Sequence, residues 1–161
     1  ARGAKAGAAR AIFRRGARAR AIGVIRTSAS APLPARLVEL QTELRELLVE
    51  ARPDVVAVER VFFQVNVRTA MAVGQASGIA MAEAHRAGCA VVEYTPTQVK
   101  QAVAGDGRAD KEAIGHMVQT LLGLGAVPRP ADAADAAALA LCHLAHAPVR
   151  ERAAATAGAR R

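Results

Sequence analysis

Aromatic residues are scarce in this 161-residue chain, which has no Trp, one Tyr and three Phe. Cysteine is equally rare, and Cys89 and Cys142 lie in separate apolar stretches without a partner motif. We therefore expect two buried free thiols, and not a disulfide or a zinc site. No apolar run approaches the roughly 20 residues of a membrane span, and no signal-peptide pattern opens the sequence. These absences favour a cytoplasmic protein with no membrane association.

Acidic residues are absent from the first 26 positions, which hold eight of the 22 basic residues. Ala, Arg and Gly dominate residues 1–20, so we expect a disordered basic leader there. The end of the chain, residues 149–161, has four Arg and one Glu and is expected to be a flexible basic tail. The net charge of +8 thus comes from the two ends. Such arms permit contact with nucleic-acid phosphates without demonstrating it.

The body of the chain, residues 21–148, alternates between helical and extended patterns and is expected to form one domain. Apolar residues recur at helical spacing in several segments, whereas short β-branched runs indicate buried strands. Helices are expected at 34–51, 67–87, 97–103, 111–124 and 131–146, and strands at 21–26, 55–59 and 90–94. This order predicts an α/β fold in which helices flank a sheet.

Two carboxylates, Asp132 and Asp135, lie three residues apart at the start of the last expected helix. That spacing places both side chains on one face, where a divalent cation could collect their oxygens. The same pattern, following Pro130, is also an ordinary helix N-terminus, in which acidic side chains suit the positive end of the dipole. The pair alone does not decide between a metal site and a cap.

Glu59 closes the apolar run of the second expected strand. Open α/β sheets bind ligands beyond the carboxyl ends of their strands, so this position favours a functional residue. Glu59 could equally be the first solvated residue after a buried strand. Phe62 and Phe63 lie just past this strand, and they could stack on bases or pack under a loop. His143 and His146 are expected to be surface or core residues of the last helix and not metal ligands.

Four motifs occur in order and at matching intervals over most of the chain. They are Val58-Glu59-Arg60-Val61-Phe62, Tyr94-Thr95-Pro96-Thr97-Gln98-Val99-Lys100, Gly105-Asp106-Gly107 leading to Ala109-Asp110-Lys111, and Ala131-Asp132-Ala133-Ala134-Asp135-Ala136. From about Ile22 to Pro148 the sequence resembles the RuvC Holliday-junction resolvases, with features of the actinobacterial type. The resemblance implies a ribonuclease-H-like mixed sheet flanked by helices.

The resemblance also implies an activity. Members of the family are homodimers that make symmetric nicks in four-way DNA junctions during recombination and repair, using Mg²⁺ or Mn²⁺. Two ions per subunit are expected in an intact site, and RuvA and RuvB are expected partners. Clustered carboxylates that hold two ions suit in-line attack on a phosphodiester.

The resemblance assigns roles to particular residues. Glu59, Asp132 and Asp135 match three of the family's four catalytic, metal-binding acids. Lys100 and Lys111 match basic residues that would hold or neutralise the scissile phosphate. The residues expected to contact DNA are Phe62, Phe63, Asn66, Arg68, Lys100 and Lys111.

One feature of the family is missing. Its first strand ends in an Asp-Pro-Gly motif that supplies the first catalytic acid, whereas no Asp precedes Asp54 in this chain. The N-terminal strands are therefore expected to be missing or replaced. One hypothesis is a mis-set start or frameshift upstream of Ile22. The other is a degenerate homologue that binds junctions without cutting them.

Overall fold

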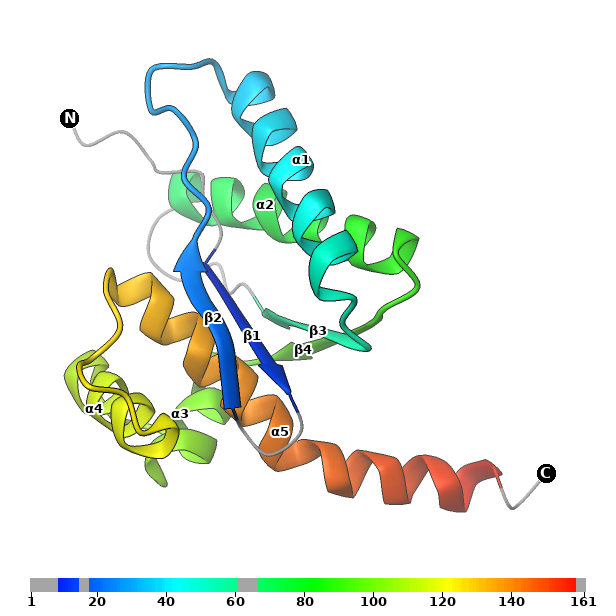
Figure 1. The fold of residues 1–161 in the computed structure, drawn as a ribbon, viewed down its shortest axis with the longest axis vertical. Coiled ribbons are helices and arrows are strands. Elements are labelled where there is room, and N and C mark those ends of the chain that lie inside the picture. Colours follow the sequence, from blue (N-terminus) through cyan, green and yellow to red (C-terminus); the bar gives the residue numbers. More distant parts are fainter. Residues whose placement is uncertain (1–8, 15–17, 61–66, 159–161) are drawn as a thin grey trace.

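The computed structural model describes residues 9–14, 18–60 and 67–158 (Figure 1). Two strands, β3 (Val55–Glu59) and β4 (Ala90–Tyr94), form a parallel pair in which Glu59 lies beside Tyr94. Two earlier strands, β1 (Ala9–Arg14) and β2 (Arg18–Val24), form an antiparallel pair. Among the described residues, no strand joins the two pairs.

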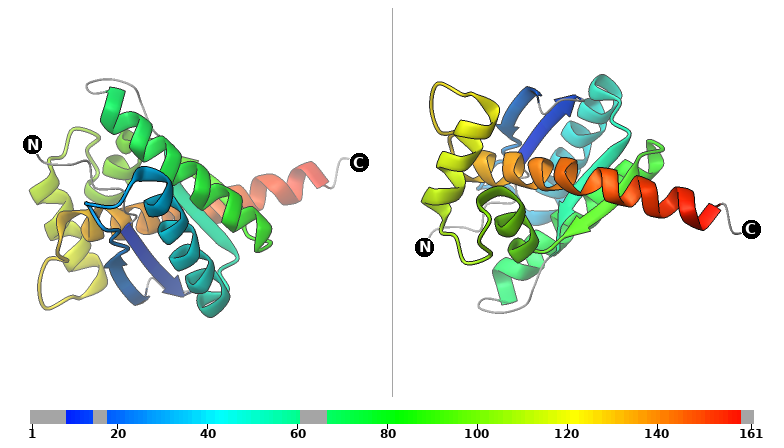
Figure 2. Two further views of the ribbon diagram at one scale, coloured as in Figure 1. Left: turned by 90° about the horizontal axis from the view of Figure 1, so that it is seen from above. Right: turned by 90° about the horizontal axis from the view of Figure 1, so that it is seen from below.

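The helices form two groups around these strands. The first consists of α1 (Leu33–Ala51) and α2 (Val67–Arg86), which pack against each other. The second consists of α3 (Pro96–Ala104), α4 (Lys111–Leu122) and α5 (Ala131–Gly158). The long α5 packs on α3 and α4 and also contacts β1, β2 and β3. Its second half extends away from the rest of the molecule (Figure 2).

In the largest hydrophobic cluster of the described residues, α5 packs against β4, α3 and α4. Tyr94 and Cys142 are almost completely buried in it, at 1% and 0% exposure. Val118 of α4 and Ala137 and Ala138 of α5 are also at 0% exposure. The small alanine side chains allow α5 to approach its neighbours closely, so the helix that carries Asp132 and Asp135 is anchored by its middle turns.

An ion pair between the half-exposed Arg45 of α1 and the buried Glu83 of α2 holds the two helices together. Glu83 of α2 is 2% exposed and accepts hydrogen bonds from the Arg45 guanidinium at 3.0 Å and from the Gln41 amide at 2.6 Å. These hydrogen bonds lower the pKa of Glu83 to about 2. Both Cys89 and Cys142 are buried free thiols, as expected from the sequence.

Most expected elements are confirmed, with ends shifted by a few residues at most in the middle of the chain. The α/β class is confirmed as well. No helix among the described residues is long and apolar enough to cross a bilayer.

The expectation for the two ends of the chain was wrong over the described residues. The segment 1–20 was expected to be disordered, but β1 and the start of β2 lie within it. Backbone pairing between the two strands compensates there for a weak hydrophobic pattern. The tail 149–161 was expected to be flexible, but α5 continues through Pro148 to Gly158. Its Ala, Arg and Glu residues are strong helix formers, which accounts for this continuation.

Candidate active site

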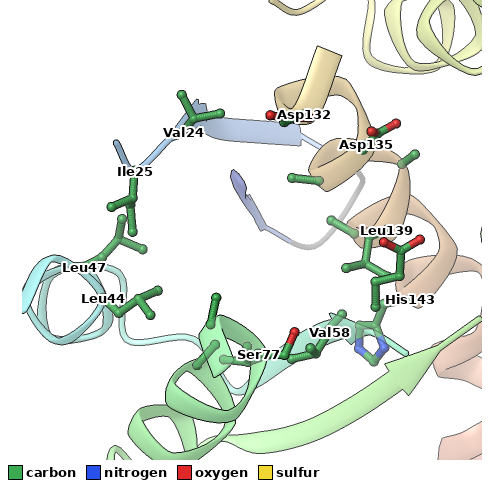
Figure 3. Close-up of a pocket in the computed structure, with 18 of the residues that line it drawn as sticks. Val24, Ile25, Leu44, Leu47, Val58, Ser77, Asp132, Asp135, Leu139 and His143 are labelled. Carbon is green, nitrogen blue, oxygen red and sulfur yellow. The ribbon is translucent and has the colours of Figure 1, made fainter. Parts of the chain in front are cut away.

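All five charged residues singled out as catalytic by resemblance lie around one cavity, whose volume is about 1640 Å³. They are Glu59, Lys100, Lys111, Asp132 and Asp135. Figure 3 shows Asp132 and Asp135 on the wall that α5 contributes, with Leu139 and His143 further along the same helix. The residues come from β3, α3, α4 and α5, so only the folded chain brings them together.

Glu59 lies at the carboxyl end of β3, as expected from the sequence. Open α/β sheets bind ligands beyond this end of their strands. Burial raises the pKa of its carboxyl group, and the nearby charge of Asp135 raises it further. Lys111 acts in the opposite direction and lowers this pKa. The three side chains therefore share one electrostatic environment, in which added positive charge would favour the ionised form of Glu59.

Asp132 and Asp135 occupy the first two turns of α5. Both are solvent-exposed, whereas Ala133 and Ala134 between them are buried. The Lys111 Nζ lies 3.2 Å from the Asp135 Oδ2, and the two side chains are 75% and 46% exposed. A pair this open to water adds little stability to the fold.

The two lysines are positioned by the starts of their helices. A capping box between Thr95 and Gln98 fixes the beginning of α3, and Lys100 follows one turn later. The Asp110 carboxylate accepts a hydrogen bond from the Ala113 amide and caps α4, which makes Lys111 the first helical residue. A cation at a helix N-terminus opposes the dipole, so local helix stability does not explain Lys111 there.

Sequence reasoning missed one contact beside this site. Tyr94 is hydrogen-bonded to the His143 Nδ1 at 3.0 Å, and His143 lines the same cavity as the carboxylates. The bond ties β4 to α5 two turns beyond Asp135. The spacing of Asp132, Leu139 and His143 along one helix face was a signal for this placement, because residues at helical intervals share a face. Its partner, 49 residues earlier, gave no signal.

The oxygen donors of the site match the ligands that Mg²⁺ prefers, because this ion commonly binds through one or two carboxylates and several waters. The Asp135 carboxylate lies close enough to Glu59 to raise the pKa of Glu59, so the two fit such a role. Within residues 9–14, 18–60 and 67–158, however, no group of three or more His, Cys, Asp or Glu side chains converges on one point. The expected count of two ions therefore stays a prediction.

The remaining residues expected to contact DNA lie, in sequence, between the end of β3 and the first turn of α2. Phe62, Phe63 and Asn66 lie outside the described residues, and Arg68 belongs to the first turn of α2. Their roles stay predictions. The turn expected at Gly105-Asp106-Gly107 is present, since the Asp106 carboxylate accepts a hydrogen bond from the Arg108 amide.

Comparison with known proteins identifies the family. The family model described as "Crossover junction endodeoxyribonuclease RuvC" matches residues 7–143. The protein of that name from Streptomyces avermitilis is 54% identical over 133 residues, which cover 83% of this chain and 76% of the relative. The one from Chloroflexus aggregans is 50% identical over 131 residues, covering 81% and 80%.

Two solved structures show the same fold. The structure of Thermus thermophilus RuvC superposes with a TM-score of 0.77 and 36% identity, over 89% of this chain and 96% of the other. Thermus thermophilus RuvC in complex with a Holliday junction substrate gives 0.73 and 38%, over 82% and 81%. The family match begins at residue 7, so the resemblance starts well before Ile22, where we expected it to start. The chain belongs to the RuvC family of crossover junction endodeoxyribonucleases.

Proposed function

We propose that this chain is a Holliday-junction resolvase, a divalent-metal-dependent endonuclease that makes symmetric nicks in four-way DNA junctions. The observation that carries the proposal is the gathering of Glu59, Asp132 and Asp135 with two lysines around one cavity. Similarity to a RuvC structure in complex with a Holliday junction substrate supports the choice of DNA.

Each part of the site has a role in this proposal. Glu59, Asp132 and Asp135 would hold Mg²⁺ or Mn²⁺, which supplies an activated water and stabilises the leaving oxygen. Lys111 lines the cavity, with its Nζ 3.2 Å from the Asp135 Oδ2, and would meet a phosphate that approaches the carboxylates. Lys100, on the wall formed by α3, would stabilise the charge that develops on that phosphate.

The proposal extends to the assembly. A four-way junction has two-fold symmetry, and a symmetric pair of nicks requires two equivalent sites, so we propose a homodimer. Contacts with RuvA and RuvB in the cytoplasm follow from the family resemblance alone.

A second candidate is a homologue that binds four-way junctions without cutting them. The observation that favours it is that no three or more His, Cys, Asp or Glu side chains converge on one point among the described residues. A metal site without its full set of ligands commonly has little activity.

Single substitutions of the carboxylates test the proposed chemistry. Purified wild-type chain, Asp132→Asn and Asp135→Asn are incubated with a synthetic four-way junction and Mg²⁺, and nicking and binding are measured separately. Each variant should cut at least about 100-fold more slowly, since even residues that only support a metal ligand commonly cost 10–100-fold. Junction binding should persist.

The matched control is Asp106→Asn, which makes the same chemical change in an exposed turn. It should cut like the wild type. Nicking by all variants at the wild-type rate would refute the assigned roles. Binding of the junction by wild type without any nick would favour the second candidate.

A further inference from the structure

The charged side chains of the candidate active site are unevenly paired. The Lys111 ammonium lies 3.2 Å from the Asp135 carboxylate. Glu59 and Asp132 form no ion pair with any described residue. Lys100 lines the same cavity and forms no ion pair in that part of the chain either. Of the two lysines at the cavity, only Lys111 thus meets a candidate metal ligand directly.

The two partners of this ion pair belong to different helices. The Asp110 carboxylate caps α4 by accepting a hydrogen bond from the Ala113 amide, which fixes the backbone of Lys111. This helix packs against α5, which carries Asp135. The lysine side chain itself is 75% exposed and has a flexible four-carbon stem. Its ammonium can therefore leave the carboxylate without a movement of either helix.

The charge of Lys111 acts on a second candidate ligand as well. Burial and then the charge of Asp135 raise the pKa of Glu59, whereas the charge of Lys111 lowers this pKa. One ammonium thus favours the ionised form of a neighbouring carboxyl group, as a bound metal cation also does. A divalent cation and an ammonium beside the same carboxylate repel each other, so each disfavours the other at Asp135.

We propose that Lys111 is the counter-cation of the metal-free site and exchanges with a divalent cation at Asp135. The released ammonium is then free to bind a DNA phosphate at the same site. Metal and phosphate therefore favour each other's binding, because the metal releases Lys111 and the phosphate engages it. The inference rests on the proposed nuclease function and describes how its two ligands are coupled.

Metal affinity in the absence of DNA tests the exchange. Mn²⁺ is titrated calorimetrically into the full wild-type chain and into variants in the same buffer. Lys111→Met removes the charge and keeps an unbranched side chain. It should bind Mn²⁺ about 3–10-fold more tightly than wild type, because one exposed ion pair and one nearby like charge each contribute a small factor. Lys111→Arg keeps the charge and should bind Mn²⁺ no more tightly than wild type.

The matched control is Arg108→Met, which removes the same charge from an exposed turn near the start of α4. Its affinity for Mn²⁺ should stay within about 2-fold of wild type, since exposed charges that are not in contact are largely screened by salt. Equal or weaker Mn²⁺ binding by Lys111→Met than by wild type would overturn the inference. An equal gain by Arg108→Met would overturn it as well, because net charge alone would then explain the result.

Junction cutting at saturating Mn²⁺ separates the exchange from simple support of a metal ligand. Lys111→Met should cut at least about 10-fold more slowly than wild type despite its tighter metal binding, because the phosphate loses its cation. A residue that only supported the ligands would lose metal affinity and cutting together. Wild-type chain that binds Mn²⁺ and leaves the junction intact would refute the nuclease proposal, with the exchange still decided by the titrations. Absence of Mn²⁺ binding in wild type and in every variant would overturn both.

Discussion

The hydrogen bond between Tyr94 and His143 is expected to hold α5, and with it Asp132 and Asp135, in a fixed position relative to Glu59. Tyr94→Phe removes the phenolic oxygen and keeps the ring. Tyr94 is 1% exposed, and the centroids of its ring and the His143 ring are 6.0 Å apart. Loss of one buried hydrogen bond costs about 1–2 kcal/mol. For a chain of this size, we expect the melting temperature to fall by about 2–8 °C.

Urea denaturation measures this loss, and the slope of the free energy against urea should not change, because the same surface is exposed on unfolding. A double-mutant cycle with His143→Leu should give a coupling energy of about 1 kcal/mol. Junction cutting should fall more than junction binding, since a shift of about 1 Å in a catalytic group can cost 100-fold. A coupling energy below about 0.3 kcal/mol, or unchanged cutting by Tyr94→Phe, would refute the reasoning.

Four further substitutions test the packing and charges of the fold. Gly115→Ala places a Cβ 2.9 Å from a Val127 methyl and should destabilise the chain by about 1–3 kcal/mol in urea, whereas Gly78→Ala, with open space around it, should stabilise α2 by about 0.5–1 kcal/mol. Glu59→Gln should unfold at a higher temperature than wild type at pH 7, because the raised pKa of Glu59 means that folding disfavours its ionised form. The melting temperatures of the two proteins should converge as the pH falls below 4.5. A variant less stable than wild type at pH 7 would contradict this reasoning. The pKa of Glu83 is lowered from 4.5 to about 2, so its ionised form stabilises the fold above pH 4.5 and this effect is lost as the pH falls toward 2. Glu83→Gln should therefore be less stable than wild type at pH 7, and the difference should shrink between pH 4.5 and 2. A difference that does not change with pH would be inconsistent with the ion pair.

Local sequence patterns were sufficient for the elements that carry the candidate site. The β-branched run that ends in Glu59 and the helical spacing of the leucines in α1 are strong signals, because burial imposes these periods on the sequence. The rule that parallel strands present ligands at their carboxyl ends placed Glu59 correctly at the cavity. The proximity of Asp135 and Lys111, in contrast, followed from family resemblance and not from spacing.

The elements at the two ends could not be read from local pattern. Arg and Ala alternate in β1 and β2 with few large apolar residues, so their stability depends on pairing with each other and on contact with α5. The last helix was expected at 131–146, yet α5 continues through Pro148 to Gly158, because helix-forming residues lie on both sides of the proline.

Cleavage of a four-way junction by the wild-type chain tests the central claim most directly. A synthetic junction labelled on each of its four strands, and a linear duplex of the same sequence, are incubated with the chain and Mg²⁺, and the products are mapped to the nucleotide. The proposed function predicts paired nicks in two opposed strands of the junction and none in the duplex. Equal cutting of the duplex, or a junction that stays intact, would contradict it.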